Sequence, residues 1–315
     1  MVTFEDRDRT PERSLVGIVP NFSEGRRPEV IEAIVRSLAV PGVVLLNRQS
    51  DPDHNRLDCT LVGSPEAVRR SAIAGAAEAI RLIDMTEHRG SHPRMGAVDV
   101  IPFMPVRRFT MDECVDLARS FARELAEGLG LPVYCYDRAA LRPERESLAQ
   151  VRKGEYEGLK ADVARGQRLP DFGPDELGRA GAVAVGARKP LIAFNIYLTG
   201  EEDAAKGIAR SVRESSGGLP AVRAIGFAVP ERGCVQVSMN LIDHETTGIA
   251  EAFEAVRSEA AGRGMEVIDS EIVGLVPEAA LDDAVRALLR LDGGWDPSQQ
   301  VLERLMSRAD AEGVG

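Results

Sequence analysis

The chain of 315 residues carries the same order of predicted elements twice, and this repeat limits its fold more than any other feature. A short apolar run begins the first half, and Pro28 then opens a helix whose apolar side chains recur every three or four residues. A later helix has Ser64 as its expected N-cap. The expected strands and helices are 15–19, 28–38, 43–47, 57–62, 65–82 and 97–103. Their order is β-α-β-β-α-β.

Further elements are expected before the second half begins. Thr110 and Glu113 form a capping-box pattern that starts a helix, and Gly130 ends this helix before an apolar strand at 133–136. Segment 142–166 is charged and is expected to be helical in part. Segment 166–181 is rich in Gly, Pro and Asp and is expected to be a loop.

The second half repeats the order of the first. Its expected elements are a strand at 191–198, a helix at 202–215, strands at 222–229 and 234–241, a helix at 247–263, a strand at 267–275 and a last helix at 277–291. The order is that of the split βαβ or ferredoxin-like arrangement. We therefore expect an α/β (α+β) fold of two ferredoxin-like βαββαβ subdomains packed side by side, with a groove between them that favours ligands. The expected boundaries are a polar leader at 1–14, an N-terminal subdomain at 15–187, a C-terminal subdomain at 188–292 and a polar tail at 293–315.

Charge and composition exclude several classes of protein. The net charge of −11 provides no basic footprint for nucleic acid. No apolar run reaches the roughly 20 residues that a membrane helix needs, and the N-terminus has no apolar signal core. The four cysteines form no C-x-x-C pair and have no zinc-like spacing. We expect a soluble, reduced, cytoplasmic protein without a nucleic-acid or membrane partner.

The segment RGSHPRMG contains the strongest candidate for acid–base chemistry. Gly90 and Pro93 bracket His92 and exclude an uninterrupted helix, so the imidazole is presented on an irregular loop. Arg89 and Arg94 flank it, and they would lower its pKa and attract carboxylates. Two interpretations remain open from the residues alone: a catalytic histidine, or a loop histidine that only bonds the backbone.

Two apparent metal motifs are incomplete. His88 and His92 have the i, i+4 spacing of a zinc pair, but the helix that this geometry needs is broken, and no third ligand is near. DPDHNR opens like a calcium loop, but Arg56 stands where glycine is needed and Val62 where a glutamate is needed. No metal is expected. DPDHNR is either a polar turn between strands or a binding loop.

Three other polar segments also allow two interpretations each. NFSEGRRP, at 21–28, is a common helix start or an anion site at a helix N-terminus. The glycine-rich stretch from DFGP at 171 to GARK at 186–189 is a mobile surface loop or a lid over a binding groove. QVSMN, at 236–240, places three polar side chains on one strand face, which lines a site or faces solvent.

Together these segments resemble the formimidoyltransferases, which pass a formimidoyl group from N-formimidoyl-L-glutamate to N5 of tetrahydrofolate. The resemblance extends in order from about Val16 to Leu291. Its stretches are VPNFSEGRRPEVI, DPDHNRLDCTLVG, LIDMTEHRGSHPRMGAVDVIPF, RPERESLAQVRKGEYEGL, GAVAVGARKPLIAFNIYL, QVSMNL and SEIVGLVP. It implies a role in histidine degradation and one-carbon metabolism, two α/β subdomains, tetrahydrofolate as co-substrate, no metal, and a homodimer.

The resemblance also implies roles for particular residues. His92 is the implied catalytic residue. The implied folate-binding residues are Gly173, Pro174, Asp175, Glu176, Leu177, Gly178, Arg179, Ala180 and Gly181. The expected substrate-binding residues are Asn21, Asp51, His54, Asn55, Arg56, Arg94 and Arg188, in which arginine suits the substrate carboxylates.

The chain departs from the bifunctional animal-type members of this family in three ways. It is expected to be monofunctional, without the cyclodeaminase half, so a separate cyclodeaminase is a possible partner. Ala180 stands where those enzymes carry a tryptophan, and Tyr197 stands where an asparagine is more usual. Two alternative functions stay open: folate-dependent formyl transfer to or from glutamate, and a non-catalytic folate-binding relative.

Overall fold

The computed structural model describes residues 14–281, 288, 291 and 296–309. The described residues divide into two compact units, the first ending at Arg188 and the second running from Lys189 to Arg308. Each unit has its own hydrophobic core.

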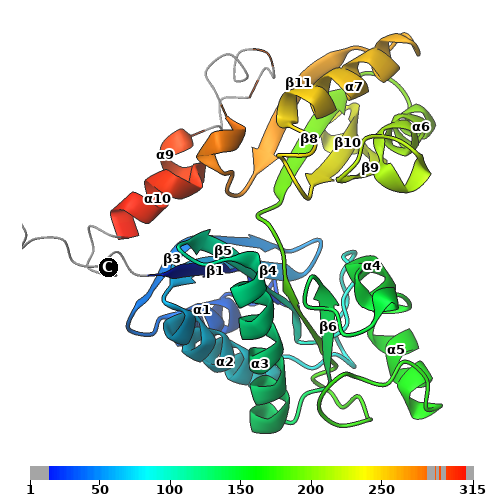
Figure 1. Cartoon of the computed structure of the whole chain (residues 1–315). Coiled ribbons are helices and arrows are strands. Elements are labelled where there is room, and N and C mark those ends of the chain that lie inside the picture. Colours follow the sequence, from blue (N-terminus) through cyan, green and yellow to red (C-terminus); the bar gives the residue numbers. More distant parts are fainter. Residues whose placement is uncertain (1–13, 282–287, 289–290, 292–295, 310–315) are drawn as a thin grey trace, which may run out of the picture. The chain divides into compact units, whose positions relative to one another are not determined.

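Unit 1 is a mixed sheet with helices packed on it (Figure 1). Its strands are β1 (Leu15–Ile18), β2 (Asn21–Phe22), β3 (Val43–Asp51), β4 (Arg56–Gly63), β5 (Val98–Arg107), β6 (Val133–Asp137) and β7 (Val183–Ala187). Its helices are α1 (Pro28–Leu38), α2 (Pro65–Leu82), α3 (Met111–Leu129), α4 (Leu148–Val151) and α5 (Glu155–Ala164). β1 and β2 share one position between β4 and β5, and β3 lies on the far side of β4, all antiparallel. This is the ferredoxin-like strand order, and β7 and β6 extend it beyond β5 as parallel strands.

Local sequence explains where the helices begin and end. Ser64 caps α2 by accepting a hydrogen bond from the backbone N–H of Ala67. Thr110 and Glu113 form a complete capping box at the start of α3, and Gly130 ends that helix in the left-handed conformation at φ 64°. These three signals are confirmed where the sequence predicts them.

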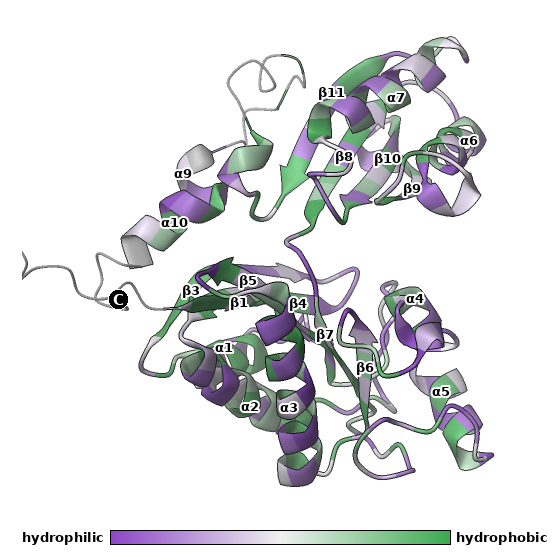
Figure 2. Cartoon of the chain, in the orientation of Figure 1, coloured by the Kyte–Doolittle hydropathy of each residue, from purple (hydrophilic) through white to green (hydrophobic). Residues whose placement is uncertain are grey.

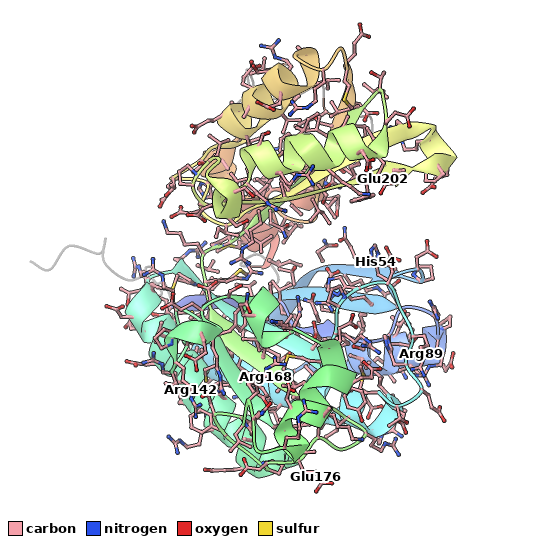
Figure 3. All side chains as sticks on the ribbon, turned by 90° about the vertical axis from the view of Figure 1, so that its right-hand side faces the viewer. His54, Arg89, Arg142, Arg168, Glu176 and Glu202 are labelled. Atoms are coloured by element: carbon pink, nitrogen blue, oxygen red, sulfur yellow. The ribbon has the colours of Figure 1, made fainter. Side chains whose placement is uncertain are left out.

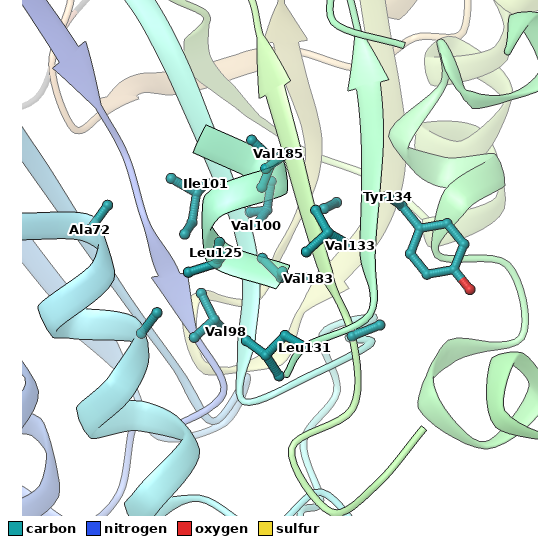
Figure 4. Packing of buried hydrophobic residues seen from close by; sticks show 14 of the residues in the cluster. Ala72, Val98, Val100, Ile101, Leu125, Leu131, Val133, Tyr134, Val183 and Val185 are labelled. Atoms are coloured by element: carbon teal, nitrogen blue, oxygen red, sulfur yellow. The ribbon is translucent and has the colours of Figure 1, made fainter. Parts of the chain in front are cut away.

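One face of the unit 1 sheet carries the core. Helices α1, α2 and α3 lie against this face, and the visible outer side of α3 is largely hydrophilic (Figures 1 and 2). Leu125 of α3 packs among Ile101 of β5 and Val183 and Val185 of β7 (Figure 4). All four side chains are completely buried, and burial of this kind contributes roughly 1.5–3 kcal/mol per large side chain.

The other face of the same sheet carries polar side chains. Along β4, Leu57, Cys59 and Leu61 are buried in the core, whereas the alternating Arg56 and Asp58 lie on the opposite face. The candidate site is built on this second face.

Unit 2 is a four-stranded antiparallel sheet with two helices. Its elements are β8 (Ile192–Leu198), α6 (Glu202–Val212), β9 (Val222–Val229), β10 (Cys234–Leu241), α7 (Ile249–Ala261) and β11 (Val267–Val273). The strand order β11-β8-β10-β9 is again ferredoxin-like. Two short helices, α9 (Pro297–Gln300) and α10 (Leu302–Ala309), come after this sheet, and Val301 between them is buried in the core of this unit.

The repeated βαββαβ order is confirmed in both units, with differences in detail. Strand β7 is not among the predicted elements. The helix predicted at 277–291 shows only a 3-10 turn at Glu278–Ala280, and most of residues 282–291 lie outside the described residues. The predicted leader up to residue 13, and residues 293–295 and 310–315 of the predicted tail, also lie outside them, whereas much of 297–309 is helical.

Candidate functional site

His92 lies on the loop that leads into β5, and one of its two ring nitrogens is hydrogen-bonded within the chain. Nδ1 lies 2.7 Å from the carbonyl oxygen of Pro93. A carbonyl only accepts, so Nδ1 carries the proton and donates it to this bond, and Nε2 keeps a free lone pair. The side chain is half-buried. The imidazole is therefore oriented as a base with Nε2 as its reactive atom.

The loop of His92 is packed against the DPDHNR turn between β3 and β4. A Cβ on Gly90 would lie only 2.3 Å from the carbonyl oxygen of His54, so the close approach requires glycine. Asn55 joins the segments by accepting from the backbone N–H of Gly25 at 2.9 Å and donating to the carbonyl of Arg89 at 2.9 Å. Asn55 itself adopts the left-handed conformation at φ 51°, which asparagine tolerates better than most residues.

His54 stands beside His92 on this turn. The two rings meet edge to face with their centroids 6.0 Å apart. His54 Nδ1 donates to Asp51 Oδ2 at 2.7 Å, while Asp51 Oδ1 accepts the backbone N–H groups of Asp53 and His54, both at 2.8 Å. Asp51 thus builds the turn and orients His54 at the same time.

A buried network of four side chains underlies these histidines. Arg56 donates through Nε (3.0 Å) and Nη2 (2.6 Å) to Asn21 Oδ1, and through Nη1 to Asp99 Oδ2 at 2.8 Å. Arg152, which follows α4, pairs with the same oxygen of Asp99. The other Asp99 oxygen accepts the backbone N–H of Met95 at 2.9 Å. The pairing of β2 with β5 skips Asp99, a bulge of the kind that redirects a side chain.

The network sets the charge at the site. Burial alone would raise the pKa of Asp99, but Arg152 and Arg56 outweigh it and hold the pKa at about 2. Burial lowers the pKa of His92, and the positive charges of Arg56 and Arg152 lower it further, to about 3. At neutral pH the carboxylate is ionised and the His92 imidazole is neutral.

Asp58 lies next to this network on β4, opposite Asn21 of β2. Burial raises the pKa of Asp58 to about 6, although the charge of Arg56 offsets part of the effect. The raised pKa means that ionisation of Asp58 destabilises the fold, progressively above the unfolded pKa and fully above about pH 6.

We therefore expect Asp58→Asn to stabilise the protein at pH 8, by up to about 3 kcal/mol. The unfolded carboxyl ionises near its usual value and the folded one about two pH units higher, so the penalty appears between these values and is complete above the folded pKa. The gain should therefore disappear below about pH 4. Urea unfolding at pH 8 and pH 4 measures both; a variant that is less stable than the wild type at pH 8 contradicts this account.

Arg94 and His88 hold the loop in place. Arg94 is buried, pairs with Glu155 and Glu157 at the start of α5, and donates through Nε to His88 Nδ1 at 3.3 Å. His88 Nε2 donates to the carbonyl of Asn55 at 3.1 Å. Both ring nitrogens of His88 are thus committed, which leaves none for a metal.

The expected anion site at the start of α1 is filled by the chain itself. Glu24 is buried, and its Oε1 accepts the backbone N–H groups of Arg26 at 2.8 Å and Arg27 at 2.9 Å. A carboxylate at a helix N-terminus is stabilised by the helix dipole. The helix N-terminus in NFSEGRRP thus binds an anionic group, but this group is the carboxylate of Glu24 in the same segment.

The predicted folate loop, Gly173–Gly181, contains neither helix nor strand. Its end adjoins the His92 segment, because the backbone N–H of Ala97 donates to Ala180 at 2.8 Å and that of Ala182 to Met95 at 2.9 Å. Its middle lies elsewhere: Glu176 and His54 stand at opposite ends of unit 1 in Figure 3. These hydrogen bonds therefore connect the C-terminal end of this loop, at Ala180, to the segment that follows His92.

Two predicted features remain, Arg188 and the polar residues of QVSMN. Arg188 follows β7, where its backbone N–H donates to Phe103 at 3.0 Å, four residues along β5 from Asp99. In unit 2, Gln236 is buried, Ser238 is half-buried and Asn240 is exposed. These three share a strand face but differ in environment.

Two residues of the network were not singled out in the sequence. Asp99 carries a signal, since it is the one charged residue in the apolar run 97–103. Arg152 carries no such signal, because it lies 53 positions from Asp99 in the sequence and their contact forms only in the folded chain. Among the described residues, no helix is long and apolar enough to cross a membrane, and no group of three or more His, Cys, Asp or Glu side chains is placed to hold a metal.

Comparison with known proteins places the chain in a family. Residues 15–188 match the formiminotransferase domain, N-terminal subdomain, and residues 193–301 match the formiminotransferase domain. Glutamate formimidoyltransferase of Streptococcus pyogenes serotype M1 is 41% identical over 292 residues, which are 92% of this chain and 97% of that protein. The protein of the same name from Thermoplasma acidophilum is 44% identical, covering 94% of this chain and 98% of its own length. Formimidoyltransferase-cyclodeaminase of Sus scrofa is 48% identical over 86% of this chain, which spans 51% of that longer protein. The chain belongs to the formiminotransferase family.

Proposed function

We propose that the chain is a glutamate formimidoyltransferase, which transfers the formimidoyl group of N-formimidoyl-L-glutamate to N5 of tetrahydrofolate and releases L-glutamate. The observation that carries the proposal is the imidazole of His92, whose Nδ1 is bonded to the Pro93 carbonyl and whose Nε2 is free, beside the Arg56–Asp99–Arg152 network. A base of this kind suits a reaction in which a proton moves between two nitrogens.

His92 would act first as a base and then as an acid. N5 of tetrahydrofolate forms a bond to the formimidoyl carbon, the π pair of the C=N bond moves onto the imino nitrogen, and Nε2 takes the proton that N5 loses. The C=N bond then re-forms as the bond from that carbon to the glutamate nitrogen breaks, and the same proton passes from Nε2 to the glutamate nitrogen. No other reactant is needed. Such catalysis is worth about 10²–10⁴-fold, and holding two substrates together supplies roughly 7–11 kcal/mol more.

The other residues would position this chemistry. His54, held by Asp51, borders His92 on the side of the DPDHNR turn, and Asn21 and Arg56 form the floor of the site. Asn55 and Arg94 are fully engaged within the chain, so we propose that they fix the two loops. The Gly173–Gly181 loop is the proposed folate segment, with Ala180 and Gly181 at its end nearest the His92 segment. Arg188 is proposed to meet a more distant part of a substrate.

A turnover assay tests the proposal directly. We expect the purified chain to convert formimidoylglutamate and tetrahydrofolate to glutamate and 5-formimidoyltetrahydrofolate, measured by glutamate release. N-formylglutamate, as a parallel donor, separates formyl transfer from formimidoyl transfer. Tight tetrahydrofolate binding without turnover of either donor would instead identify a non-catalytic folate-binding protein.

The resemblance also supports a homodimer that works in the cytoplasm. Sedimentation of the purified chain, whose mass is 34.0 kDa, distinguishes a dimer from a monomer. A separate cyclodeaminase would be the enzyme that consumes the product.

A further inference from the structure

Two guanidinium groups share one carboxylate at the site. Both Arg56 and Arg152 donate to Oδ2 of Asp99, whose other oxygen is taken by the backbone N–H of Met95. The Asp99 carboxylate is completely buried, and the two arginine side chains are 11% and 14% exposed. Asp99 therefore compensates only one of these two charges, and Asp58, which is ionised above about pH 6, compensates the other on the side of Arg56.

The two arginines differ in the donors they have left. All three nitrogens of Arg56 are used, two on Asn21 and one on Asp99. Arg152 uses only Nη2, and its Nε is buried without a hydrogen-bond partner among the residues described here. The donors left without a partner therefore lie on Arg152, not on Arg56.

We propose that Arg152 binds the α-carboxylate of the formimidoyl donor, next to His92. The inference rests on the proposed function. The α-carboxylate is attached to the carbon that also bears the departing nitrogen, so a carboxylate fixed on Arg152 brings that nitrogen to the imidazole. Guanidinium groups bind carboxylates through charge-assisted hydrogen bonds, often in pairs.

Substrate binding at this position would also change His92 itself. The charged and titratable groups around its ring are Arg56 on β4, Arg152 after α4, Asp99 on β5 and His54 on the β3–β4 turn. Burial lowers the pKa of His92, and the two arginines lower it further, to about 3 in the free protein. A bound carboxylate adds a negative charge beside the imidazole and raises that pKa. The imidazole would then hold the proton long enough to deliver it to the leaving nitrogen.

Three donors and two variants test this assignment. The donors are N-formimidoyl-L-glutamate, its α-carboxamide analogue and its γ-carboxamide analogue. Arg152→Gln removes the proposed contact. Arg142→Gln is the matched control, because Arg142 lies on the same stretch but its side chain is 51% exposed and lies 3.8 Å from Asp171.

We expect the wild type and the control to prefer the α-acid to the α-amide by about 10- to 100-fold in kcat/KM. Arg152→Gln should lose most of this preference and keep the preference for the γ-acid. An α-acid preference that Arg152→Gln leaves intact overturns the proposal, and so does a loss seen only for the γ-acid. A variant that instead discriminates less between tetrahydrofolate and tetrahydropteroate would assign Arg152 to the folate tail. No turnover of formimidoylglutamate by the wild type would reject the proposed function itself.

A second measurement stays informative if Arg152→Gln does not fold. In wild-type protein with labelled histidine, NMR titration should show the pKa of His92 rising when formimidoylglutamate binds without folate. The α-carboxamide analogue should leave that pKa low. An equal rise with both ligands contradicts the α-carboxylate contact.

Discussion

Replacing His92 by alanine is expected to lower kcat about 10²–10⁴-fold while leaving the fold unchanged. The reason is that Nε2 is the proposed carrier of the proton from N5 to the glutamate nitrogen. The folded protein should tolerate the change, because the ring is neutral, only half-buried, and bonded only to the carbonyl of its neighbour Pro93. Steady-state turnover with formimidoylglutamate and tetrahydrofolate measures the loss, and circular dichroism with urea unfolding checks the fold.

His244→Ala provides the matched control. His244 is also only half-buried, lies in unit 2 and is not among the residues proposed for the site, so its removal should leave kcat within about twofold. Near wild-type turnover by His92→Ala would remove His92 from the mechanism. Equal losses of kcat in both variants would mean that the effect is unspecific, arising from lower stability or from the removal of any histidine, and not from a role of His92.

Replacing Asp99 by asparagine is expected to cost about 3–5 kcal/mol of folding free energy. The substitution keeps the shape of the side chain but removes the one carboxylate that Arg56 and Arg152 share. Two buried guanidinium groups then lose the carboxylate they share, and only Asp58, beside Arg56, remains as a counter-charge. Because the pKa of Asp99 is held at about 2, its stabilising effect is complete above the unfolded pKa and is lost only as the pH falls through about 2. Urea unfolding at pH 7 measures the cost.

The exposed Asp53→Asn is the control and should change stability by less than about 0.5 kcal/mol. The double variant Asp99→Asn with Arg152→Met should be less destabilised than the sum of the two single variants, because it also removes one of the two charges. A cost below about 1 kcal/mol for Asp99→Asn would mean that water screens the two arginines, and it would contradict their burial.

Much of the fold could be predicted because its signals are local. The apolar periodicity of α1, the Ser64 cap and the Thr110 capping box each depend on residues within one or two helical turns. Strand β7 was missed because its five residues follow a loop and carry small side chains, and its identity as a strand comes from parallel pairing with β5 and β6. Such pairing leaves no local pattern.

The site was predictable only in part, for the same reason. His92 and Arg56 lie in the dense polar motifs RGSHPRMG and DPDHNR, which identify them as candidate site residues from the sequence alone. The sequence did not predict that Glu24 would fill the helix N-terminus with its own carboxylate, or that Arg94 would be taken up by α5. The convergence of Arg152 on Asp99 depends on tertiary structure, since these residues reach one another only after α4 has packed beside the sheet.

The hydrogen bond to the carbonyl of Pro93 leaves the imidazole of His92 only one nitrogen for proton transfer. Because Nδ1 is tied to that oxygen, protons enter and leave through Nε2 alone. In the proposed reaction, the nitrogen that attacks and the nitrogen that departs would therefore both lie within reach of that one atom, on the same side of the imidazole. The proton would leave from the atom that received it, without crossing the ring.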